Sequence, residues 1–96
     1  MISYTEKDGK IIVQGDIIRA SDQELDKLID TIVSSFLYGI EVTYIQDSVE
    51  YPLVKHTPDG RHIIESTTFL NISKAWYTDI RNRIESKLQE FRFSSF

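Results

Sequence analysis

The chain contains no cysteine. This absence excludes disulfide bonds, zinc ribbons, iron–sulfur clusters and thiol nucleophiles. The chain also lacks any apolar run of membrane-spanning length, and its first residues, Met1-Ile2-Ser3, do not begin a secretory signal. These absences predict a cytoplasmic protein that does not enter a membrane.

Glycine and proline are scarce, with four and two residues among 96. The sequence has no glycine-rich loop that would hold a phosphate, no Gly-x-Ser-x-Gly nucleophile motif and no His-Glu-x-x-His metalloprotease motif. Because no pattern brings a nucleophile, a base or a cofactor together, we predict a protein that is not an enzyme and that needs no cofactor.

The composition that remains is that of an ordinary globular protein, 41% hydrophobic and 27% charged. A chain of 96 residues has room for one domain, so we expect residues 1–96 to form a single compact α+β unit. Within it, residues 92–96 are expected to be an aromatic tail that either frays or docks on a neighbouring surface. A homodimer through a sheet edge, or through Phe93 and Phe96, would enlarge the small core.

Five segments show the alternation or composition of β-strands. Residues 2–6 and 10–14 flank a tight hairpin turn, and residues 40–46 are typical of a half-buried strand. Residues 49–57 and 61–70 are expected to be the arms of a second hairpin. The sequence thus predicts four to five strands.

Two amphipathic helices complete the expected fold. Ser21 and Glu24 match a capping box, so we expect a helix from Ser21 to Tyr38, ended by Gly39 in the left-handed conformation. The second helix is expected at about 74–91, capped by Ser73 or Asn71. The predicted fold is therefore α+β, an antiparallel sheet with two helices on one face, in the order ββα-ββ(β)-α.

The loop Pro58-Asp59-Gly60 fixes the register of the second hairpin. Proline suits the second position of a type I turn, and glycine accepts the left-handed conformation after it, so the loop is predicted to pair Thr57 with Arg61. His56 and His62 are then the next pair outward, side by side on one face. The same register places the following pairs further along: Val54 with Ile64 on the histidine face, and Leu53 with Glu65 and Tyr51 with Thr67 on the other. Pro52 predicts either an edge position or a bulge in the first arm.

The histidine pair has three interpretations. Two neutral imidazoles are a fragment of a transition-metal site, and two imidazoles that repel each other when protonated are a proton-responsive site. The third interpretation is two solvated residues at a hairpin tip. Zinc usually takes three or four protein ligands, whereas Asp59 is expected to serve its own turn and Glu65 to point away. His56 and His62 therefore supply half of a metal site.

Charge is unevenly distributed along the chain. Residues 1–50 carry ten acids and four bases, a net −6, whereas residues 51–96 carry five acids and seven bases, a net +2. Asp22, Asp26 and Asp30 recur every four residues and so share one flank of the first helix. They are either a solvated face favoured by the helix dipole or a docking strip for a basic partner.

The last helix shows basic residues on the borders of its apolar stripe. Lys74, Arg81 and Arg92 lie on one border, and Arg83 and Lys87 lie near the other. Trp76 or Tyr77 supplies an aromatic ring close by. A nucleic-acid surface would use these bases for phosphates and the aromatic ring for stacking. In one alternative, the aliphatic parts of these basic side chains cover the core. In the other, their charges attract the aspartates of the first helix.

These features support three hypotheses about function. The first is a small binding or regulatory protein that works by protein–protein contact, with the acidic first helix (Asp22, Asp26, Asp30) toward a basic partner. The second is nucleic-acid binding through Lys74, Trp76, Arg81 and Arg92. The third is a metal- or pH-responsive module at His56 and His62.

Overall fold

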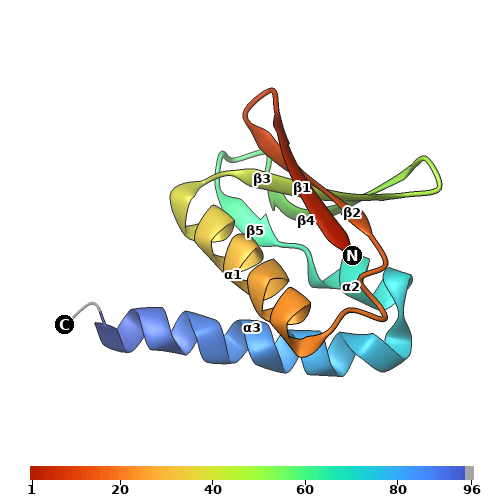
Figure 1. The fold of residues 1–96 in the computed structure, drawn as a ribbon. Coiled ribbons are helices and arrows are strands. Elements are labelled where there is room, and N and C mark those ends of the chain that lie inside the picture. The colour runs from red at the N-terminus through yellow and green to blue at the C-terminus, as the bar shows by residue number, and fades with distance from the viewer. Residues whose placement is uncertain (95–96) are drawn as a thin grey trace.

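The computed structural model describes residues 1–94, with side chains as far as Phe91. Five strands form one sheet in the order β1-β2-β3-β4-β5, and the helices lie on one side of it (Figure 1). The strands are β1 (Ile2–Lys7), β2 (Lys10–Gly15), β3 (Glu41–Gln46), β4 (Val49–His56) and β5 (His62–Ile64). The helices are α1 (Asp22–Tyr38), α2 (Ser66–Ile72) and α3 (Lys74–Ser94). The α+β class predicted from the sequence is confirmed.

The sheet is mixed, so the expectation of a purely antiparallel sheet is wrong. β2 and β3 are parallel, with Val13 opposite Tyr44, while the other neighbouring pairs are antiparallel. The reason is the connection: α1 crosses the sheet face between the two strands and returns the chain to the end at which β2 began. A parallel pair needs a crossover of this kind, usually a helix.

The start and end of α1 follow the sequence signals. Ser21 accepts a hydrogen bond from the backbone N–H of Glu24, and the Glu24 carboxylate accepts one from the N–H of Ser21, at 3.2 and 3.1 Å. Gly39 ends the helix with φ of +75°. The capping box and the left-handed glycine are both confirmed.

The second hairpin has the predicted loop and histidine register. Thr57 N–H donates to Arg61 O at 2.8 Å, Gly60 has φ of +85°, and His56 lies opposite His62. A bulge follows in β4, because Val42 of β3 pairs with Val54 and Thr43 pairs with Pro52, which leaves Leu53 as the extra residue. The bulge next to Pro52 is thus confirmed.

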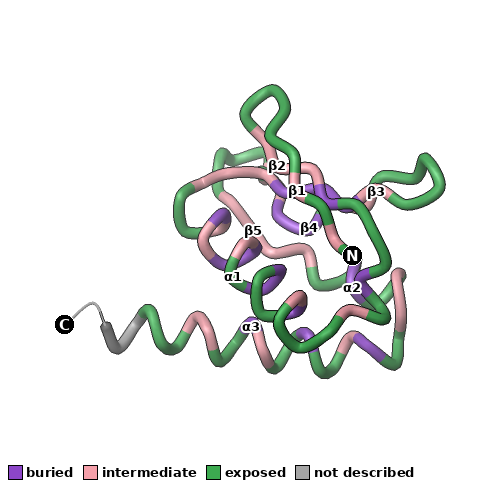
Figure 2. The backbone as a smooth tube through the Cα atoms, viewed as in Figure 1, coloured by how far each residue is buried: buried purple, intermediate pink, exposed green. Residues whose placement is uncertain are grey.

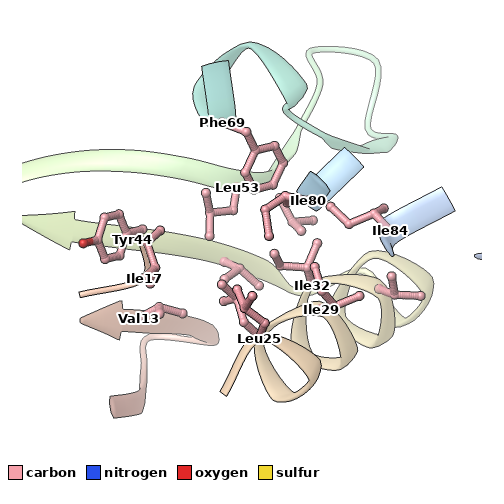
Figure 3. Packing of buried hydrophobic residues seen from close by; sticks show 14 of the residues in the cluster. Val13, Ile17, Leu25, Ile29, Ile32, Tyr44, Leu53, Phe69, Ile80 and Ile84 are labelled. Atoms are coloured by element: carbon pink, nitrogen blue, oxygen red, sulfur yellow. The ribbon is translucent and has the colours of Figure 1, made fainter. Parts of the chain in front are cut away.

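The bulge also corrects the expected orientation of Leu53. Instead of lying on the opposite face from Val54, Leu53 is fully buried beside Phe69 and Ile80 (Figure 3). A bulge turns two consecutive side chains toward the same side, and here it brings both Leu53 and Val54 into the core. The predicted pairing of Tyr51 with Thr67 is wrong, because Thr67 belongs to a helix.

That helix, α2, replaces the outer part of a predicted strand. The expected arm 61–70 ends at Ile64, and the chain turns at once into Ser66–Ile72. The threonines in this segment favour a strand, but the helical turn buries Phe69 against Trp76, with ring centroids 6.0 Å apart. Packing in the tertiary structure outweighs local propensity here, and it adds a third helix to the two expected.

α3 forms an outer layer. It packs on α1 and α2, whereas α1 and α2 contact the strands (Figure 1). Ile80 of α3 nevertheless reaches the core beside Leu53 of β4, so the helices share one face of the sheet, as the sequence predicts (Figure 3). Ser73 caps α3 as predicted, by accepting a hydrogen bond from Trp76 N–H at 3.3 Å, and the helix runs to Ser94. The side chains of Arg92 and Phe93, and the whole of Phe96, lie outside the described part.

The core lies between the sheet and the helices, while the hairpin turns are exposed (Figure 2). It contains residues from β2, β3 and β4, from all three helices and from the connection after β2: Val13, Ile17, Leu25, Leu28, Ile29, Ile32, Val33, Val42, Tyr44, Leu53, Val54, Phe69, Trp76, Ile80 and Ile84. Between residues 1 and 94, no helix has both the length and the apolar character needed to cross a bilayer.

Candidate functional site

The acidic flank of α1 faces α3. The side chains of Asp22, Asp26 and Asp30 are 91%, 75% and 55% exposed, and two cations of α3, Arg83 and Lys87, reach toward them. We call these five residues the α1–α3 charged face. The sequence placed the three aspartates correctly on one flank, but it suggested Lys74, Arg81 and Arg92 as attracting bases. The cations that occupy this position come from the other border of α3.

Arg83 serves several carboxylates at once. Its Nε lies 3.1 Å from Asp79 of the same helix, and its terminal nitrogens lie 3.6 Å from Asp22 and 3.7 Å from Asp26. The hydrogen bond with Asp79 is the main cause that raises the pKa of Arg83. Arg83 therefore remains a fixed cation between the helices, shared by three acids.

Lys87 closes the other end of the charged face. Its Nζ lies 2.8 Å from Asp30 and 3.5 Å from Glu90, and the hydrogen bond with Asp30 is the main cause that raises its pKa. The two cations thus have five carboxylates as partners, from Asp22, Asp26, Asp30, Asp79 and Glu90. An excess of negative charge remains.

A shallow groove of about 470 Å³ runs between the helices at this face. The buried Ile29 lines it together with charged and polar side chains, including Asp26, Asp30, Arg83 and Lys87. The groove has the chemistry to accept cationic or hydrogen-bonding side chains of another molecule.

The two histidines form the predicted cross-strand pair. Their ring centroids are 3.9 Å apart and the rings are tilted by 58°. Nδ1 of His56 lies 3.2 Å from Oε1 of Glu41 at the start of β3. The sequence did not predict this carboxylate, because only the pairing of β3 with β4 brings it near. The Glu41 contact orients the His56 ring.

His62 lies on the inner side of the same pair. Its Nε2 is buried and has no hydrogen-bond partner, and its ring lies against Gly39. Glu65 forms an ion pair with Lys55 at 2.7 Å, and Asp59 contacts Thr57 and Arg61 within the loop. Among the described residues, no three His, Asp or Glu side chains are arranged to hold a metal ion.

The residues proposed for nucleic-acid binding are dispersed. Trp76 is 8% exposed and packs on Phe69, so its ring is part of the core. Lys74 is exposed at the start of α3, and Arg81 pairs with Glu85 of the next turn at 3.1 Å. Trp76 is therefore not available for stacking, and the half-buried Tyr77 is the ring that neighbours Arg81. Arg92 lies beyond the described side chains.

Comparison with protein-family models, with curated proteins and with solved structures gives no match to this chain. The function must therefore be argued from the geometry.

Proposed function

We propose that this protein is a small binding module that acts by protein–protein contact and performs no chemistry, with the α1–α3 charged face docking a basic segment of its partner. The observation that carries the proposal is the excess of carboxylates over cations at the two helices. Five carboxylates share Arg83 and Lys87, and three of them project from consecutive turns of α1.

The geometry leaves these carboxylates available to a second molecule. Asp22 and Asp26 are mostly exposed, and their distances to Arg83 are longer than that of a charge-assisted hydrogen bond. A lysine or arginine from a partner can approach the same oxygens from the solvent side without displacing Arg83. Contacts of this kind favour a fast, salt-sensitive association over a very tight one.

Nucleic-acid binding has less support. Arg81 is already paired with Glu85, and stacking on Trp76 would require the ring to leave the core. The experiment below distinguishes nucleic-acid binding from binding of a basic peptide.

The test measures fluorescence anisotropy of a labelled oligolysine peptide, an oligoglutamate peptide and a single-stranded DNA at low and high salt. We expect the protein to bind the oligolysine peptide and neither of the other two ligands. Its affinity for oligolysine should fall at high salt. Replacing Asp22, Asp26 and Asp30 together by asparagine should weaken binding by about 3-fold to 150-fold, since exposed charge pairs contribute about 0.2–1 kcal/mol each.

A matched variant controls for net charge. Asp8→Asn, Asp47→Asn and Glu50→Gln together remove three negative charges as well, from exposed positions in the β1–β2 turn, the β3–β4 turn and the start of β4. Asparagine also tolerates the positive φ of residues 8 and 47. If both triple variants lose oligolysine binding equally, or if the DNA binds in place of the peptide, the proposal is wrong.

A further inference from the structure

The outer edge of β1 presents unpaired backbone groups. Asp8 and Gly9 have φ of 54° and 79°, the values of a two-residue hairpin turn. In such a turn the flanking residues, here Lys7 and Lys10, form a hydrogen-bonded pair. Hydrogen-bonded and non-hydrogen-bonded pairs alternate from there along an antiparallel ladder. The backbone N–H and C=O groups of Ile2, Tyr4 and Glu6 therefore point away from β2.

Contacts at the far end of the hairpin agree with this register. Ile2 lies opposite Gly15, and a Cβ atom at Gly15 would lie 3.0 Å from Cα of Ile2, the close approach of a non-hydrogen-bonded pair. The Gly15 carbonyl accepts a hydrogen bond from the Tyr44 hydroxyl at 2.6 Å instead. Among the residues that the structure describes, no hydrogen bond from a loop or a side chain reaches the backbone of Ile2, Tyr4 or Glu6.

A hollow lies beside this edge, between the hairpin and α1. It has a volume of about 320 Å³, and its lining combines uncharged residues, among them Ile11, Ser34 and Ile40, with one cation and one anion, Lys27 and Asp30. A second hollow of about 430 Å³ shares Ile40 and continues along Glu6–Lys10. α1 packs on β3, β4 and β5, so the underside of the first hairpin is less covered.

Two contacts place the hollow next to β1. Ile11, which lines it, is the strand partner of Glu6. Lys27, which also lines it, holds its ammonium group 4.8 Å from the centre of the Tyr4 ring. A strand added outside β1, at about 4.8 Å from it, would therefore project every second side chain toward this hollow.

We propose that the β1 edge binds an extended, uncharged segment of another protein as a sixth strand. The unpaired groups of Ile2, Tyr4 and Glu6 require a partner that offers its own backbone, which only an extended chain does. The alternate side chains of that segment are small and apolar, to match the hollow beside Ile11 and Ile40. The hollow shares Asp30 with the α1–α3 charged face, but the unpaired backbone groups of β1 belong to neither helix, so the inference does not depend on the proposed function.

The charges around the edge specify a neutral segment. Glu6 is followed by Lys7, Glu24 lies 3.5 Å from the ammonium group of Met1, and Lys27 lies over Tyr4. Opposite signs alternate, so a charged segment gains nothing here. The β1 strand of a second copy would bring its own charged residues, Glu6 and Lys7, to this edge, so it suits the edge less well than a neutral segment does.

The test uses an acetylated and amidated peptide of alternating valine and threonine, titrated into the isotope-labelled protein and followed by NMR. We expect shifts confined to the amides of Ile2, Tyr4 and Glu6 and to the hollow at Ile11, Thr31 and Ser34. A peptide with proline at alternate positions, which cannot form the ladder, should give none. Absence of shifts with the first peptide, or equal shifts with both, would overturn the proposal.

Variants at Glu6 separate the backbone from the side chain. Glu6→Pro removes one outward N–H and should weaken peptide binding about tenfold or more, whereas Glu6→Thr keeps the N–H and should bind like the parent. Ser34→Arg, which fills the hollow from α1, should also weaken binding. It replaces Glu6→Pro as the test variant if Glu6→Pro lowers the melting temperature of the protein. Equal affinity of Glu6→Pro and Glu6→Thr, or of Ser34→Arg and the parent, contradicts the proposal. Concentration-dependent dimerisation that Glu6→Pro abolishes would contradict the chosen occupant and assign the edge to a second copy.

Discussion

The imidazole of His62 lies against Gly39, the residue at which α1 ends. A Cβ atom at residue 39 would lie 3.0 Å from Cε1 of His62 and 3.4 Å from its Nε2. Gly39 thus meets two requirements at once, since its φ of +75° favours glycine and its missing side chain makes room for the ring. Through this contact, the β4–β5 hairpin determines which residue can end a helix formed earlier in the chain.

Gly39→Ala is expected to destabilise the protein for both reasons. The left-handed backbone alone costs about 1–2 kcal/mol for a residue with a Cβ atom. The contact with His62 adds a steric term, so the loss in free energy of unfolding should be larger in the parent than in a His62→Ala background. Urea denaturation of the four proteins of this cycle measures both terms. If the loss is the same in both backgrounds, the ring contact contributes no strain.

Leu53→Ala is expected to cost about 2–5 kcal/mol, the range for truncating a buried leucine. Leu53 is fully buried by the bulge, in contact with the cluster that includes Phe69 and Ile80. Val49 of the same strand is 50% exposed, so Val49→Ala should change the free energy of unfolding by less than about 1 kcal/mol and is the matched control. Similar losses for both substitutions would mean that the bulge does not place Leu53 in the core.

Local signals determined much of the fold in advance. The capping residues Ser21 and Glu24, the helix end at Gly39 and the loop 58–60 each depend on backbone chemistry within a few residues, and each was predicted. The parallel pairing of β2 with β3 was not predicted, because it depends on the direction in which α1 crosses the sheet. The helix α2 was not predicted, because the local sequence favours a strand. The packing of Phe69 against Trp76 decides the conformation of this segment instead.

The candidate site shows the same division. Helical periodicity placed Asp22, Asp26 and Asp30 on one flank, since that spacing is a property of a single helix. Which cations face them depends on how α3 rotates against α1, and the sequence pointed to the wrong border of α3. Glu41 became a neighbour of His56 only through the β3–β4 pairing. Contacts between elements that are distant in sequence carry no local signal.

The ion pair of Lys55 and Glu65 predicts a pH dependence. The hydrogen bond from Lys55 is the main cause that lowers the pKa of Glu65. Because the folded-state pKa lies below the unfolded value, the stabilisation is complete above the usual glutamate pKa of about 4.3 and is lost as the pH falls through the lowered value. In that window the unfolded chain binds more protons, so the free energy of unfolding rises with pH.

Comparison with Glu65→Gln isolates this contribution. At neutral pH the parent should be more stable, by up to about 1 kcal/mol because the pair is partly exposed. The difference should shrink as the pH is lowered below about 4.3, when Glu65 becomes protonated in the parent. Thermal melts of both proteins across the acid range give the result. A difference that is constant with pH would show that the pair does not titrate as stated.

The two cations of the charged face should contribute unequally to the α1–α3 contact. Lys87 lies 2.8 Å from Asp30, whereas Arg83 lies 3.6 Å from Asp22, whose side chain is 91% exposed. A double-mutant cycle of Lys87→Met and Asp30→Asn should therefore give a coupling free energy of about 0.3–1 kcal/mol that decreases with added salt. The cycle of Arg83→Met and Asp22→Asn should give a coupling near zero, because the longer contact is screened by water. A larger coupling for Arg83 and Asp22 than for Lys87 and Asp30 would reverse this order and show that Arg83 is the main electrostatic link between the helices.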